Sequence, residues 1–358
     1  MSYKYEELDK RLISVVPSKR QVEYQQREFY GFIHFTVNTY TNKEWGLGDE
    51  SPEIFNPYDL DAESWVKAAV SAGMKGLILT CKHHDGFCLW PSKYTEHSVK
   101  NSPYKDGKGD IVKELSDACK KYGIKFGVYL SPWDRNCAVY GTGKEYDDFY
   151  INQMTELLTN YGDVYTFWMD GACGEGPNGK KQVYDWERYY AKVRELQPEA
   201  VLSICGPDVR WCGNEAGVVR KSEWSVVSKL MTSPAFTAEL SQKEDNEEFR
   251  KRAIDPTNEE LGSREVLENE PELAWYPAET DLSIRPGWFY HPEEDDKVRS
   301  LENLKDIYLP ANVKKLSNLF CLSKSCSPDL KIHVKTGSVT AENIKNSDLF
   351  KEGKVVLE

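Results

Sequence analysis

The first 200 residues alternate short apolar segments with amphipathic ones, and this order constrains the fold more than any other feature. The apolar segments are rich in β-branched and aromatic residues, which favours strands over 29–37, 76–82, 125–131, 164–171 and 200–205. Apolar residues recur at helical spacing between them, which predicts helices over 61–73, 110–123, 147–162 and 184–197. This alternation predicts βαβ units around a parallel sheet.

A (β/α)8 barrel and a doubly wound sheet both have this alternation. No Gly-x-Gly-x-x-Gly motif follows the first predicted strand, which disfavours a dinucleotide-binding sheet. We therefore predict an α/β fold with a (β/α)8-like (TIM) barrel over residues 1–310. After residue 215 the pattern weakens, and we expect a strand over 222–228, a polar excursion over about 235–271, a strand over 273–284 and a helix over 296–309.

The composition argues against several classes of function. A net charge of −12 disfavours a nucleic-acid partner and binding to anionic membranes. No apolar run approaches the roughly 20 residues that cross a bilayer, and the N-terminus shows no apolar signal-peptide core. The nine cysteines are scattered without a Cys-x-x-Cys pair, which favours free thiols in a reducing compartment. We expect a cytoplasmic protein, and the sequence favours no particular oligomeric state.

One carboxylate stands at the end of the fourth predicted strand. Residues 164–171 carry no charge until Asp170, and Gly171 ends the segment. The carboxyl ends of parallel barrel strands form the active site, so Asp170 is a candidate catalytic residue. The alternative is an Asp that caps the turn before Gly171. Other polar and aromatic side chains at or just past predicted strand ends are His34, Glu44, Trp45, His83, His84, Tyr129, Trp168 and Glu215.

The histidines raise the alternative of a metal site, which fits poorly. His83 and His84 are adjacent, so on an extended strand they would point to opposite faces and could not bind one ion. No His-x-His or His-x-x-x-His pair occurs. We therefore predict no metal and no cofactor. For each histidine alone, a hydrogen-bonded core or loop histidine is the competing interpretation.

The carboxylates suit glycoside hydrolysis, which needs one ionised carboxylate and one carboxylic acid that donates a proton. Asp170 and Glu215 could both face one end of the barrel. Trp211 could provide apolar surroundings that raise the pKa of the Glu215 carboxyl. The competing interpretation of Glu215 is a solvated loop carboxylate.

Longer motifs carry a resemblance to a known family. The chain resembles the α-L-fucosidases of glycoside hydrolase family 29, and most of all the subgroup that acts on α-1,3/1,4-linked fucose in branched glycans. The resemblance covers residues 20 to about 308. The matching stretches are 34–40, 42–46, 80–87, 129–134, 167–171, 206–211, 213–217, 222–225 and 283–291.

The resemblance implies a retaining double displacement in a (β/α)8-like barrel, with fucosylated oligosaccharides or glycoconjugates as partners. Asp170 matches the nucleophile, and Glu215 matches the acid/base position of that subgroup, a position that varies within the family. The residues that match the fucose pocket are His34, Glu44, Trp45, His83, His84 and Tyr129. Trp168 and Trp288 would form apolar walls, and Arg210 and Trp211 would either bind substrate or hold the acid/base loop.

The C-terminus departs from the family pattern. Only about 50 residues follow Tyr308, too few for the β-sandwich that many members carry. We expect residues 311–358 to form a short atypical segment, with the last barrel strand replaced by 316–322, distorted or missing. Truncation of the gene product is one explanation. A non-catalytic or unstable fucose-binding remnant is therefore the alternative to an active enzyme.

Overall fold

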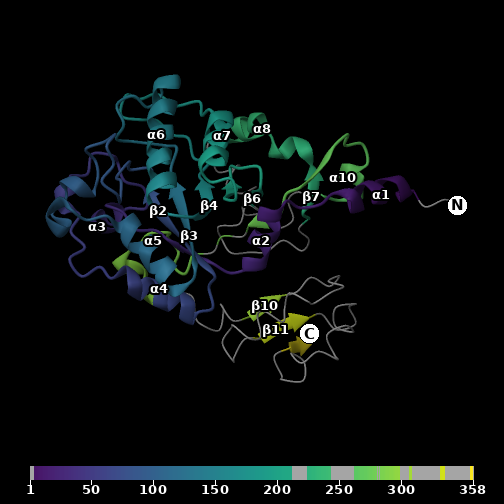
Figure 1. Ribbon diagram of the computed structural model, residues 1–358, viewed down its shortest axis with the longest axis horizontal. Helices are drawn as coiled ribbons and strands as arrows, with labels where there is room; N and C mark the ends of the chain where they lie inside the picture. Colours follow the sequence, from purple (N-terminus) through teal and green to yellow (C-terminus); the bar gives the residue numbers. More distant parts are fainter. Residues whose placement is uncertain are drawn as a thin grey trace.

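The computed structural model describes residues 4–211, 224–242, 262–279, 281 and 283–298, with the backbone of 306–308, 331–334 and 355–357. Within these residues, seven strands form one parallel sheet in the order β1-β2-β3-β4-β5-β6-β9 (Figure 1). Their bounds are β1 Gly31–Ile33, β2 Gly76–Lys82, β3 Lys125–Leu130, β4 Val164–Met169, β5 Val201–Ile204, β6 Val209–Trp211 and β9 Ala278–Glu279. The fold is α/β, as predicted.

Four helices connect the central strands: α4 Ala62–Ser71, α5 Ile111–Tyr122, α6 Lys144–Asn160 and α7 Trp186–Leu196. Helix α5 begins where the Asp110 side chain accepts from the Lys113 amide, and it ends at Gly123 in the left-handed conformation. Helices α4 and α5 pack together below β2 and β3 in Figure 1, while α6, α7 and α8 (Pro234–Ser241) follow one another along the top. The predicted helices are present with shifted ends.

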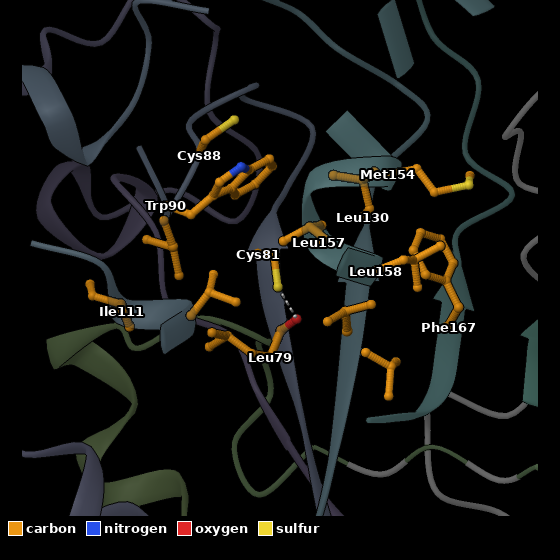
Figure 2. Packing of buried hydrophobic residues seen from close by; sticks show 14 of the residues in the cluster. Leu79, Cys81, Cys88, Trp90, Ile111, Leu130, Met154, Leu157, Leu158 and Phe167 are labelled. Carbon is orange, nitrogen blue, oxygen red and sulfur yellow. Dashed lines mark hydrogen bonds between the residues drawn. The ribbon is translucent and has the colours of Figure 1, made fainter. Parts of the chain in front are cut away.

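The core lies between the sheet and these helices. Alternation along β2 directs Leu79 and Cys81 into the main cluster, which also contains Leu130 of β3 and Phe167 of β4 (Figure 2). Ile78 points to the other face and packs with Tyr129 and Tyr165. The sheet therefore buries apolar side chains on both faces, as parallel sheets do.

Hydrogen bonds across the face of the sheet that carries Ile78 show that the sheet is curled. Glu279, on edge strand β9, accepts from Tyr30, which directly precedes the opposite edge strand β1. It also accepts from Trp168 of the central strand β4, at 2.7 Å between Nε1 and Oε1. One short side chain can reach both only if the two edges bend toward each other. The described strands thus form a curled half-barrel, consistent with the predicted TIM-like architecture.

The remaining helices are α1 Glu6–Ser14, α2 Lys19–Arg27, α3 Asn38–Thr41 and α10 Arg264–Leu267, with 3-10 turns η1 Pro52–Ile54, η2 Val99–Asn101, η3 Tyr104–Gly107, η4 Lys229–Thr232 and η5 Pro292–Lys297. Two small sheets contain the other strands: antiparallel β7 Val226–Ser228 and β8 Leu273–Trp275, and parallel β10 Asp306–Tyr308, β11 Lys331–Val334 and β12 Val355–Leu357. No described helix is long and apolar enough to span a bilayer. All six described cysteines are free thiols.

Several predictions for the second half of the chain were wrong. The expected strand over 222–228 contributes β7, which pairs with β8 outside the main sheet, and the sixth main-sheet strand is β6 instead. The expected strand within 273–284 is present as β9, the seventh strand of the main sheet, while β8 forms separately before Pro277, which cannot donate to a ladder. The expected helix over 296–309 is also wrong: Pro292 starts η5 earlier, and Ile307 and Tyr308, which favour extended chain, lie in β10.

Smaller differences concern the ends of elements and the excursion. The first strand has three residues rather than nine, because the chain turns into α3 after residue 37. The polar excursion contains α10 and most of α8, while residues 243–261 lie outside the described part. Helices α1 and α2 were not predicted. The proposed replacement strand at 316–322 also lies outside the described residues, so the expectation for the C-terminal segment stays a prediction, as does the cytoplasmic location.

Candidate active site

Asp170 lies one residue past the end of β4, where the sequence predicted it. Its Oδ2 accepts from the Tyr129 hydroxyl at 2.7 Å, and its Oδ1 accepts from the Ala172 amide at 2.8 Å. The His84 Nε2 atom lies 3.8 Å from Oδ2. The Asp170 side chain keeps 23% of its surface exposed, so it is fixed in direction and still reachable. This is the geometry of a carboxylate that can act on a bound molecule.

Tyr129, from β3, lies beneath this carboxylate and is almost fully buried. Burial, with the nearby charge of Asp170, raises the pKa of Tyr129 well above its usual value. The phenol therefore stays protonated and donates to Asp170. Its ring stacks at a tilt on Trp168, with centroids 5.3 Å apart. Tyr129 and Trp168 thus form one aromatic floor under Asp170.

His34, His83 and His84 form an imidazole cluster beside this floor. The ring centroids of His83 and His84 lie 4.1 Å apart, and those of His34 and His83 lie 6.1 Å apart. Burial lowers the pKa of His34 and of His84 to about 3, and that of His83 well below its usual value. His34 and His84 are therefore neutral at pH 5 and above, His83 is neutral near pH 7, and all three offer hydrogen bonds without charge there.

The expected divergence of His83 and His84 was wrong. Strand β2 ends at Lys82, so both histidines lie in the turn that follows and their rings can face the same side. The prediction had assumed that the strand continued through them. In the described part of the chain, no group of three or more His, Cys, Asp or Glu side chains could hold a metal ion.

The hydrogen bonds of His84 define its tautomer. The Ser131 hydroxyl donates to the Trp133 carbonyl at 2.7 Å, so its oxygen must accept from His84 Nδ1, which is also 2.7 Å away. In a neutral ring, Nε2 then carries no proton. This atom faces the side of Asp170 and can accept a hydrogen bond from a bound hydroxyl group.

Trp288 covers the imidazole cluster from a distant loop. Its ring stacks on His34 with centroids 5.2 Å apart. The Glu44 carboxylate holds this loop, because it accepts from the backbone amides of Trp288 and Phe289. Glu44 thus holds in place the loop that carries Trp288, which forms one wall of the site. Trp45 stands at the rim, 44% exposed, with its ring edge-on to His84 and Trp133.

Arg210 is buried on β6. It donates to the carbonyl of Trp224 at 2.7 Å and to that of Tyr276 at 3.2 Å. In sequence, Arg210 and Trp224 flank the segment that carries Glu215, which lies outside the described residues. Whether Arg210 binds substrate or holds the acid/base loop stays a prediction. Trp211 is partly buried on β6 and pairs with Glu279 of β9.

The sequence analysis missed Ser131, Trp133 and Phe289 as neighbours of the cluster. Ser131 and Trp133 were visible in the stretch after the third predicted strand, and both contact His84. Phe289 lies edge-on to His83 with centroids 5.0 Å apart. Its position next to Trp288 was the available signal.

A buried ion pair supports the turn that carries the histidines. Lys82 Nζ donates to Asp134 Oδ2 at 2.8 Å and to Gln153 Oε1 at 2.9 Å, with the Lys82 and Asp134 side chains 0% and 3% exposed. Asp134 also accepts from the amides of Asn136 and Cys137, which fixes the loop after β3. The pair therefore joins the end of β2, which leads into His83 and His84, to the loop after β3.

Lys82→Met is expected to lower the free energy of unfolding by about 3–5 kcal/mol, because it leaves the Asp134 charge buried without its partner. Urea unfolding would measure this. The matched control is Lys121→Met, whose partner Glu63 lies at 2.6 Å on the surface, and which should change little. Equal midpoints for the two variants would contradict the structural role of the buried pair.

Comparison with known proteins identifies the family of this chain. Residues 13–307 match the family model described as alpha-L-fucosidase. The chain belongs to the alpha-L-fucosidase family. It is similar to Alpha-L-fucosidase 1 of Arabidopsis thaliana, with 43% identity over 294 residues that cover 82% of this chain and 53% of that protein. The chain spans about half the length of the curated fucosidases that it matches first.

Solved fucosidase structures have the same fold. A candidate alpha-L-fucosidase from Bacteroides ovatus is 53% identical, with a TM-score of 0.74 over 85% of this chain and 51% of that one. A glycoside hydrolase family 29 fucosidase from Ruminococcus gnavus, solved in complex with fucose, is 33% identical, with a TM-score of 0.63 over 81% of this chain and 59% of that one.

Proposed function

We propose that this chain is an exo-acting α-L-fucosidase that removes terminal L-fucose by a retaining double displacement. The observation that carries the proposal is Asp170, a reachable carboxylate fixed by Tyr129 and Ala172 next to three neutral imidazoles. Membership of the alpha-L-fucosidase family supports it. The relatives' identities of 43% and 53% also favour catalysis over the alternative of a binding-only remnant.

The chemistry of the site suits a neutral deoxy sugar. Neutral imidazoles, such as His84 with its free Nε2 lone pair, can exchange hydrogen bonds with hydroxyl groups. Trp168 and Trp288 present apolar ring faces, which suit a methyl group and the face of a sugar ring. A charged substrate would find no opposite charge among the three imidazoles, since their lowered pKa values keep them uncharged.

In the proposed mechanism, Asp170 attacks the anomeric carbon and forms a β-linked fucosyl-enzyme, while Glu215 protonates the departing oxygen. Glu215 then deprotonates the water that releases fucose with its original α configuration. This requires the two carboxyl groups to lie about 5–5.5 Å apart when substrate is bound. The preference for α-1,3/1,4 linkages is proposed from the resemblance of the stretches around Arg210 and Glu215.

Purified protein given an aryl α-L-fucoside and its β-anomer provides the test of this function. We expect release of the phenol from the α-anomer only, and release of fucose from α-1,3/1,4-fucosylated branched oligosaccharides faster than from linear α-1,2-linked ones. Binding of fucose without turnover of either aryl fucoside would contradict the proposal.

A further inference from the structure

Glu279 is a buried carboxylate inside the half-barrel, and the proposed reaction does not use it. Its side chain belongs to β9, and only 5% of the residue is exposed. Its Oε2 accepts from the hydroxyl of Tyr24 at 2.6 Å and from that of Tyr30. Its Oε1 accepts from Trp168 Nε1 at 2.7 Å. Both oxygens therefore accept hydrogen bonds. The three donors are Tyr24 of α2, Tyr30 just before β1, and Trp168 of β4.

The two oxygens serve different parts of the molecule. Oε2 binds the hydroxyls of Tyr24 and Tyr30, which are themselves 2.6 Å apart. Oε1 binds only the indole of Trp168 among the described contacts. This N–H group is the one polar atom of the Trp168 side chain, so its hydrogen bond determines how the ring is turned about its two side-chain torsions.

Trp168 is packed between two aromatic rings next to the site. Trp168 lies edge-on to Phe32 and at a tilt on Tyr129, with centroid separations of 5.2 Å and 5.3 Å. Tyr129 in turn donates to Asp170. Trp168 and Asp170 are two residues apart, and Tyr129 contacts both of them. The indole is thus packed between Phe32 and Tyr129, and its N–H group is held by Glu279.

We propose that Glu279 is a positioning residue for substrate, which holds Trp168 as the apolar wall of the sugar pocket through its indole N–H. The identity of that sugar as fucose rests on the proposed function. A wall that contacts the non-reacting face binds substrate and transition state equally, so its loss raises KM and leaves kcat nearly unchanged. A residue that only joined the two edges of the sheet would instead affect stability.

The experiment compares three substitutions in hydrolysis of an aryl α-L-fucoside. Glu279→Met keeps the side-chain length and removes both acceptors, and we expect KM to rise about tenfold with kcat changed less than about threefold. Glu279→Gln keeps a carbonyl oxygen for the indole and should restore KM to within about threefold of the parent. Tyr24→Phe removes one donor to the same carboxylate and leaves the hydrogen bond from Trp168 intact. It should lower thermal stability and leave KM unchanged.

A double-mutant cycle separates positioning from general damage. Trp168→Phe lacks the N–H group, so Glu279→Met should add less than about twofold to KM in that background. Additive effects would overturn the proposal, as would an unchanged KM in Glu279→Met. A fall in kcat with KM unchanged would overturn it as well.

A measurement without substrate keeps the proposal testable if the protein hydrolyses no fucoside. In protein labelled with ¹⁵N-tryptophan, the Trp168 indole proton can be assigned by its absence in Trp168→Phe. We expect Glu279→Met to shift this resonance and to speed its exchange with solvent at least about tenfold, and Tyr24→Phe to do neither. An unchanged resonance in Glu279→Met would overturn the positioning role. Inactivity of the parent protein would count against the proposed function alone.

Discussion

Asp170→Asn is expected to lower kcat on an aryl α-L-fucoside by about 10⁴-fold or more, because the amide cannot form the covalent intermediate. The fold should persist. The Asn carbonyl oxygen can still accept from the Ala172 amide, and the Tyr129 hydroxyl can accept from the new amide nitrogen. Steady-state kinetics, with thermal unfolding on the same samples, would check both expectations.

The control is Asp163→Asn, which removes an exposed carboxylate at the opposite end of β4. Its kcat should equal that of the parent. If Asp170→Asn kept more than about a tenth of the parental kcat, only about 1.4 kcal/mol of barrier would be attributable to Asp170. That result would remove it as the nucleophile.

Glu215→Ala is expected to lower kcat about 10²–10⁴-fold on a fucosylated oligosaccharide, whose alcohol leaving group needs a proton. The loss should be smaller on an aryl fucoside with a good leaving group, because the phenolate departs without help. Azide should restore turnover of the aryl fucoside, since it attacks the fucosyl-enzyme without needing a general base.

The configuration of the azide product tests the assignment. Attack on a β-linked enzyme intermediate gives the α-fucosyl azide. A β-azide would mean that Glu215 is the nucleophile and that the two roles are reversed. Glu268→Ala, which alters a carboxylate near the N-terminal helix, should show neither the loss nor the rescue.

The fold of the first half could be predicted because its signals are local. Helix α5 has its Asp110 cap, its apolar stripe and Gly123 in sequence, and β2 is a continuous buried run. The second half failed where pairing depends on distant partners. Strand β6 has three residues, and its neighbours β5 and β9 come from segments about 75 residues apart, so neither composition nor periodicity indicates it.

In the candidate site too, local features could be predicted and contacts between distant segments could not. Asp170 was visible as a lone charge at the end of an apolar strand. The facing rings of His83 and His84 depend on where β2 ends, which the pattern left open by a residue or two. The contact of Glu44 with the Trp288 loop and that of Glu279 with Trp168 join residues 244 and 111 positions apart. Such pairs become neighbours only through the curl of the sheet and its loops.

The stereochemistry of the first-formed product tests the central claim most directly. Hydrolysis of an aryl α-L-fucoside in deuterated buffer can be followed by proton NMR before the sugar mutarotates. We expect α-L-fucose to appear first, because two successive displacements at the anomeric carbon restore its configuration. β-L-Fucose as the first product would mean a single displacement by water. It would contradict the covalent role of Asp170 and, with it, the retaining mechanism.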